Sequence, residues 1–437
     1  MKKINNSVLA LALFVGIANA NAQEKKTLTL DDAVQLGIQN SKNLKIDAAK
    51  IEEATANLLE AKNRQLPELK ISGSYMYLPL KPNIDIKLPG VSGAGGPEVH
   101  QVAYGSANVS VPIYSGGRIK YGIESAKYLV EASKLTTEND KVAIAYNVAQ
   151  AYNNLFKANQ SIKVLEENLT ASQKRDETFL KLENNGVIAR NDRLKASLQT
   201  SNIELQLLEA KNNYNIANIN MDLLLGLPET TEIEVDQNYI EEGNEVKPLD
   251  FYLNEARENR KDLQALDKQR QAVALGTKSA KAENLPSIAF TGGYVAADIP
   301  KFLTIYNAVN VGVGISYNLS NLWKENSSLK QSQAREMQLE ATNELLNDNI
   351  KLDVNREYQN TDYSKKRIAV FEKSAEQANE NYRITKNKYD NGLATMTELL
   401  DADAAQISAN VGVINAKADA ALAYRKLLQT TGTLTNK

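Results

Sequence analysis

Residues 30–75 read LDDAVQLGIQNSKNLKIDAAKIEEATANLLEAKNRQLPELKISGSY, and residues 249–294 read LDFYLNEARENRKDLQALDKQRQAVALGTKSAKAENLPSIAFTGGY. The two stretches align without a gap. A leucine, a Leu-Pro pair and a tyrosine recur at matching positions: Leu30 with Leu249, Leu66-Pro67 with Leu285-Pro286, and Tyr75 with Tyr294. Matching prolines at a constant offset argue against a chance alignment. The chain therefore contains one structural unit twice.

The repeat continues toward the end of each half. Further matches pair Tyr152 with Tyr358, Gly186 with Gly392, and Gly226 with Gly432. The first copy is longer because it holds a Pro- and Gly-rich stretch from Lys81 to His100, which predicts a long loop. We expect a first repeat over residues 23–226, an irregular equatorial connector over 227–248, and a second repeat over 249–437.

Each repeat shows the same order of secondary structure. Apolar periodicity predicts a helix of about 35 residues, two strands, a helix of about 65 residues, and a return helix of about 40. An Asn-Gly pair separates the last two helices in each copy, at Gly186 and at Gly392. Glycine supplies the left-handed conformation that ends a helix, so each pair predicts a hairpin tip. The expected fold is mainly α with β.

The strand segments carry the signal for a membrane. From Val309 to Leu319 and from Ala103 to Ile113, small or apolar residues alternate with mostly polar ones. Strands of about ten residues with this alternation fit a transmembrane β-barrel, and a soluble antiparallel sheet is the alternative. Four strands are too few to close a barrel, which takes at least about eight. Several copies would have to share one barrel.

The long helices show the spacing of coiled coils. The seam positions in the return helix of the first repeat recur in steps of four and three: Leu194, Leu198, Ser201, Leu205, Leu208, Asn212, Asn215 and Ile219. This spacing predicts a narrow heptad seam along which neighbouring helices pack. The remaining positions are rich in Lys, Glu, Gln and Asn. Such helices are suited to the wall of a channel that contacts water on both its inner and its outer surface.

Composition excludes several classes of function. The net charge is −2, and no basic face indicates nucleic acid. The chain has no cysteine and one histidine, so disulfides and thiolate zinc sites are excluded, and we expect no metal, no cofactor and no enzymatic activity. Residues 1–22 read as a secretory signal peptide, because their apolar run from Val8 to Ala18 is too short to span a membrane.

Together these features resemble the TolC-type outer-membrane efflux proteins. The resemblance rests on the duplicated unit, both Leu-Pro pairs, the stretch VSVPIYSGG from Val109 to Gly117, and both glycine tips. It implies a homotrimer in outer-membrane lipid, with a twelve-strand β-barrel and a twelve-helix α-barrel in the periplasm. It also implies an exit duct for an efflux or secretion system, docked to a periplasmic adaptor and an inner-membrane transporter. The alternative is a periplasmic adaptor or another secreted coiled-coil protein.

The same resemblance implies which residues form the site. The second tip of the family has a tyrosine three residues before its glycine and acids six and nine residues after it. Tyr389, Glu398 and Asp401 match these positions, and Asp192 matches the acid of the first tip. The resemblance assigns these four residues to a periplasmic gate, although Ala394 stands where the family often has arginine. It also assigns contact with the adaptor to the tips, at Gly186, Val187, Gly392 and Leu393.

Overall fold

A computed structural model of the chain describes residues 25–80, 82, 99–240, 245–300 and 302–435. The predicted signal peptide and most of the predicted loop from Lys81 to His100 lie outside these residues. Among the described residues, no helix combines the length and the apolarity of a membrane span.

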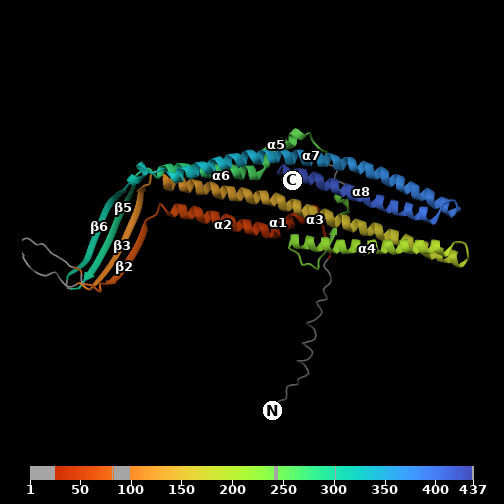
Figure 1. Cartoon of the computed structure of the whole chain (residues 1–437), viewed down its shortest axis with the longest axis horizontal. Coiled ribbons are helices and arrows are strands. Elements are labelled where there is room, and N and C mark those ends of the chain that lie inside the picture. Colours follow the sequence, from red (N-terminus) through yellow and green to blue (C-terminus); the bar gives the residue numbers. More distant parts are fainter. Residues whose placement is uncertain (1–24, 81, 83–98, 241–244, 301, 436–437) are drawn as a thin grey trace, which may run out of the picture. The chain divides into compact units, whose positions relative to one another are not determined.

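Both halves contain the same succession of elements (Figure 1). The first half has α1 (Leu30–Asn40), α2 (Lys42–Asn63), β2 (Glu68–Tyr77), β3 (Gln101–Tyr114), α3 (Arg118–Asn184) and α4 (Arg190–Leu225). The second half has α5 (Leu249–Asn259), α6 (Lys261–Ala282), β5 (Ser287–Ile299), β6 (Leu303–Ser316), α7 (Ser327–Asp390) and α8 (Met396–Thr430). The predicted duplication and the mainly helical fold are confirmed.

The opening helix of each repeat is broken, whereas the sequence predicted one continuous helix. The breaks fall at Ser41 and at Arg260. Next to the first break, Asn40 Nδ2 donates to the carbonyl oxygen of Leu225 at 2.7 Å, and Arg260 Nη1 donates to that of Thr430 at 3.2 Å. The last carbonyls of a helix have no partner within that helix. Each break thus supplies a side chain that caps the return helix of the same repeat.

The chain divides into two compact units, one of which holds the four long strands. This unit comprises residues 47–136 and 262–346. Its sheet is antiparallel throughout, in the order β2-β3-β5-β6 (Figure 1). The helical segments of the unit contact one another through polar groups. For example, Ser125 Oγ of α3 donates to the carbonyl oxygen of Ala272 on α6 at 2.9 Å.

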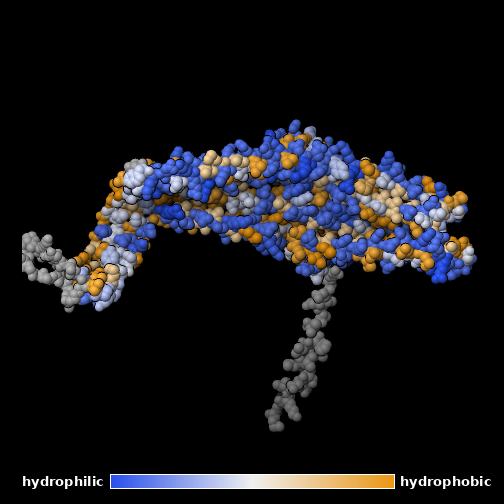
Figure 2. Space-filling view, in the orientation of Figure 1, coloured by the Kyte–Doolittle hydropathy of each residue, from blue (hydrophilic) through white to orange (hydrophobic). Residues whose placement is uncertain are grey.

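One face of this sheet is apolar and exposed. The register places Leu69, Val109, Gly292 and Val311 side by side across the four strands. On β6 the exposed apolar positions are Val309, Val311, Val313 and Ile315. Figure 2 shows hydrophobic residues gathered on the strands, whereas much of the helical surface in view is hydrophilic. The predicted alternation is confirmed, although β6 begins and ends earlier than the segment from Val309 to Leu319.

The opposite face of the sheet carries polar side chains near its middle. Asn108 and Asn310 flank Gly293 on neighbouring strands. A β-carbon at Gly293 would lie 2.7 Å from Asn108 Oδ1 and 2.8 Å from Asn310 Oδ1. An alanine at this position would therefore have to displace the two amide groups.

The other unit comprises residues up to 46, 137–261 and from 347 onward. Here β1 (Lys25–Leu28) pairs in parallel with β4 (Glu232–Val235) over a core in which Tyr152, Phe156, Met221 and Leu225 are fully buried. The connector contributes a 3-10 turn at Gln237–Ile240, whose Tyr239 ring packs 5.2 Å from that of Tyr152.

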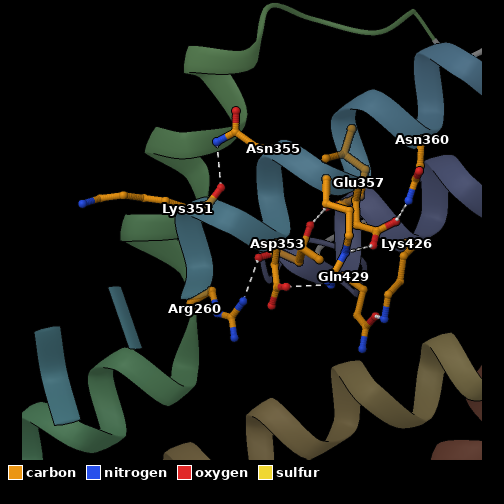
Figure 3. A network of polar contacts seen from close by, with 11 residues as sticks. Arg260, Lys351, Asp353, Asn355, Glu357, Asn360, Lys426 and Gln429 are labelled. Carbon is orange, nitrogen blue, oxygen red and sulfur yellow. Dashed lines mark hydrogen bonds and ion pairs between the residues drawn. The ribbon is translucent and has the colours of Figure 1, made fainter. Parts of the chain in front are cut away.

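Polar contacts run along α7 and along α8 in this second unit (Figure 3). The Arg356 side chain donates to Asp353 Oδ1 at 2.7 Å and to Glu357 Oε1 at 3.1 Å, and Asn360 donates to Glu357 Oε2 at 3.1 Å. On α8, Lys426 Nζ donates to Gln429 Oε1 at 2.7 Å. Glu357 is buried, so these donors compensate the cost of removing its carboxylate from water.

Candidate functional site at the hairpin tips

The first tip is a glycine-ended helix followed directly by a new helix. Gly186 has φ +73°, a left-handed conformation that costs other residues about 1–2 kcal/mol. The amide of Val187 donates to the carbonyl oxygen of Leu182 at 2.8 Å, and that of Gly186 donates to Glu183 at 2.9 Å. This pair of bonds is a Schellman motif, which satisfies the last carbonyls of α3. The Val187 residue is 66% exposed.

The second tip repeats this geometry. Gly392 has φ +72°, and the amide of Leu393 donates to the carbonyl oxygen of Lys388 at 2.8 Å. Leu393 is 78% exposed. The following helices begin differently, because Thr395 forms a capping box at the start of α8, whereas Ala189 has no side-chain cap at the start of α4. The two tips have the same turn geometry, but only the return helix of the second tip begins with a side-chain cap.

A small apolar core lies beneath the tips. It is built by side chains from all four helices of the hairpins: Phe179, Ala196, Met396 and Leu399 are buried, and Leu182, Ile188, Tyr382, Tyr389 and Leu400 pack against them. This core holds the hairpin of α3 and α4 against the hairpin of α7 and α8.

The structure places Tyr389 and Asp192 close together, on different hairpins. The Tyr389 ring packs 5.9 Å from the ring of Phe179. Partial burial raises the pKa of Tyr389, and the negative charges of Asp192 and Asp390 raise it further. The phenol is thus uncharged at neutral pH and available as a hydrogen-bond donor. Asp192 also lies 3.7 Å from Lys195 Nζ.

Glu398 and Asp401 lie on the first turns of α8. Glu398 Oε2 accepts the amide of Thr395 at 2.6 Å and its hydroxyl at 2.9 Å. These bonds from Thr395, that of the amide first, lower the pKa of Glu398. The predicted gate residue Glu398 therefore also caps its own helix. Asp401 is exposed.

Sequence reasoning missed an ion pair between the two hairpins. Arg175 Nη2 on α3 donates to Asp403 Oδ1 on α8 at 3.0 Å, and Asp403 is buried. Asp403 follows Asp401 by two positions in a polar stretch, and nothing in the sequence separates the buried acid from its exposed neighbours. In the described part of the chain, no three His, Cys, Asp or Glu side chains come together as a metal site would require.

Comparison with known proteins decides the family. The model of the family described as outer membrane efflux protein matches residues 33–227 and 252–433, which is more than half of the chain. The chain belongs to the outer membrane efflux protein family. No curated protein matches the sequence.

Solved channels of the family share the fold at low sequence identity. VceC of Vibrio cholerae is 17% identical, with a TM-score of 0.76 over 92% of this chain and 96% of VceC. CmeC of Campylobacter jejuni is 18% identical, with a TM-score of 0.74 over 93% of this chain and 86% of CmeC. The open state of MtrE of Neisseria gonorrhoeae is 16% identical, with a TM-score of 0.71 over 93% of this chain and 89% of MtrE.

Membership settles the class of function. This protein is an outer-membrane efflux channel of the TolC type, the exit duct of a tripartite efflux system, with a large helical part in the periplasm. It is a channel and not an enzyme. TolC-type channels are trimers that work with an adaptor and a pump. The alternative of a periplasmic adaptor is therefore wrong.

Proposed function

We propose that three copies of this chain join their sheets edge to edge into one barrel. The observation that carries the proposal is that neither β2 nor β6 pairs with a second strand in the described part of the chain. Open strand edges are not tolerated in lipid, because each unsatisfied backbone group costs several kcal/mol. Pairing β2 of one copy with β6 of the next would satisfy both edges and would present the apolar face containing Val311 to lipid.

The helices support the same assembly. The predicted seam on α4 is exposed at Leu194, Leu198, Leu205, Leu208 and Ile219, whereas α4 packs inside the chain through Ala196, Ile203, Leu207 and Ala210. On α7, large apolar side chains are exposed at Leu352, Tyr363, Val370 and Ile384. Exposed stripes of this kind mark a contact surface. In our proposal they pack against the helices of the neighbouring copies.

The tips are the proposed docking surface for a periplasmic adaptor, which joins the channel to an inner-membrane transporter. Val187 and Leu393 support this role, since they project large apolar side chains from polar turns. Behind them, we propose Asp192, Tyr389, Glu398 and Asp401 as the gate. Around a three-fold axis, each acid would become three facing carboxylates, which attract cations.

Native mass spectrometry in detergent, combined with planar-bilayer recording, tests the assembly. We expect a mass of three mature chains and a conductance from that species. A monomer that is soluble without detergent, with its sheet covered by its own helices, would contradict the proposal.

A further inference from the structure

The ion pair between Arg175 and Asp403 is the most buried contact between charges of the two hairpins in the described residues. The Arg175 side chain is 15% exposed and that of Asp403 is 4% exposed. The pair of Lys157 on α3 and Asp419 on α8, at 2.9 Å, is more accessible to solvent. Arg175 Nη1 and Asp403 Oδ2 are also buried, and neither has a hydrogen-bond partner among the described residues.

The pair lies at the same level of both hairpins. Arg175 precedes Gly186 by eleven residues, and Asp403 follows Gly392 by eleven residues. At 1.5 Å per residue, both lie about 16 Å from their tips. The Tyr382 ring on α7 lies 6.0 Å from the guanidinium carbon of Arg175. Helices α3, α7 and α8 thus meet at the buried ion pair.

The electrostatics keep Arg175 charged. Burial alone would lower the pKa of Arg175, but its hydrogen bond to Asp403 and the charge of that carboxylate raise it overall. Removing two charges from water costs about as much as their attraction returns, so such a pair contributes little net stability. Separation of the hairpins would hydrate both groups. The contact therefore favours a closed arrangement without making the open one prohibitive.

We propose that Arg175 and Asp403 form a lock within each subunit that holds the hairpin of α7 and α8 against the hairpin of α3 and α4 and keeps the tips closed at rest. This inference deepens the proposed function and rests on it. Both are positioning residues, since they act through the placement of the tips. The lock is separate from the residues that the resemblance assigns to the gate.

Amide hydrogen exchange and single-channel recording on the full-length channel in detergent or bilayer test the lock. Asp403→Asn keeps the shape of the side chain and removes its charge. We expect exchange at residues 176–200 and 385–402 to become about tenfold faster, with β1 and β4 unchanged, and the resting conductance to rise. The exchanged pair Arg175→Asp with Asp403→Arg should return both measurements toward wild type.

Glu380→Gln is the matched control, because Glu380 forms a 2.7 Å ion pair with Arg383 that is exposed and stays within α7. It should change neither measurement. Wild-type exchange in Asp403→Asn would overturn the proposal, and so would faster exchange with an unchanged resting conductance. If native mass spectrometry finds no trimer of the wild-type chain, the proposed assembly fails, while the exchange comparison still decides whether the pair ties the hairpins together.

Discussion

The hydroxyl of Tyr152 donates a hydrogen bond to the carbonyl oxygen of Leu28 at 2.8 Å, which ties the long helix α3 to the edge strand β1. The same hydroxyl accepts the amide of Asp236 at 2.7 Å, just beyond β4. Burial, the largest cause, raises the pKa of Tyr152 to about 12, so the hydroxyl keeps its proton. The Tyr152 hydroxyl is thus hydrogen-bonded to the backbone at the ends of both strands of the small sheet.

We expect Tyr152→Phe to destabilise this sheet by about 1–3 kcal/mol, because a buried carbonyl and an amide lose their partner. Amide exchange at residues 25–28 and 232–236 should accelerate accordingly. The control is Tyr114→Phe, which removes the hydroxyl of an exposed tyrosine on β3, in the other unit. Equal exchange in the two variants would show that the hydroxyl is dispensable.

Alanine should reduce stability to different extents at two glycines that have the same backbone conformation. Gly226 and Gly186 both have positive φ, so Ala at either costs about 1–2 kcal/mol in strain. A β-carbon at Gly226 would lie 2.9 Å from Asn40 Cβ, whereas at Gly186 it would meet nothing within 4 Å. We expect Gly226→Ala to lower the thermal unfolding temperature more than Gly186→Ala does. The reverse order would contradict the close approach at Asn40.

Asp222 should make stability depend on pH. Burial, with a smaller effect of Glu229, raises the pKa of Asp222 to about 6 from its ordinary value of 3.8. Folding therefore favours the protonated acid. The contribution is fully present below pH 3.8 and is lost as the pH rises through about 6, amounting to about 3 kcal/mol.

Asp222→Asn should remove this loss and raise the unfolding temperature at pH 7 more than at pH 4. Asn218 Nδ2 donates to Asp222 Oδ2 at 3.0 Å, and an amide oxygen can accept the same bond. Glu167→Gln, at an exposed position of α3, is the control. A gain that is independent of pH would argue against titration of Asp222.

Adjacent residues of β6 should differ in their tolerance of charge. Val311 belongs to the apolar face and Asn310 to the polar face. If the apolar face contacts lipid, Val311→Lys costs roughly 2–4 kcal/mol near the middle of the bilayer, and Asn310→Lys costs far less. The yield of heat-modifiable trimer on gels measures assembly. Similar yields from both variants would place neither face in lipid.

Neutralising the proposed gate acids should reduce selectivity for cations. Glu398→Gln retains an oxygen that can accept from Thr395, so the cap is preserved while the charge is removed. Combined with Asp401→Asn, it should shift the reversal potential in a salt gradient toward zero. An unchanged reversal potential would exclude both acids from the conducting path. Asp192→Ala and Tyr389→Phe should raise the resting conductance.

The repeat allowed much of the fold to be predicted. Matching prolines and glycines located both Leu-Pro junctions, both tips and the order of the elements. The breaks at Ser41 and Arg260 were missed because no proline or glycine stands there, and the signal is instead a capping bond to a residue far along the chain. Periodicity detected the seam on α4 but could not tell that Ala196 and Ile203 form the face packed within the chain.

The tips were located by their glycines, but the contacts around them were not. Asp192 and Tyr389 were paired only through resemblance, and Asp403 was overlooked because burial of an acid depends on the helix packed against it. The carboxylate of Glu398 was assigned to the gate, although the Thr-x-x-Glu spacing from Thr395 is a recognised capping pattern that could have been noticed.

The two open edges of the sheet have different consequences for the chain before it assembles. Strand β2 carries Glu68 and Lys70, charges that discourage unwanted pairing. Strand β6 has no charged residue and no proline over its 14 residues, and every second side chain near its middle is aliphatic. An unassembled chain in the periplasm should therefore be prone to aggregation through β6. A periplasmic chaperone that protects the chain would be expected to bind this strand first.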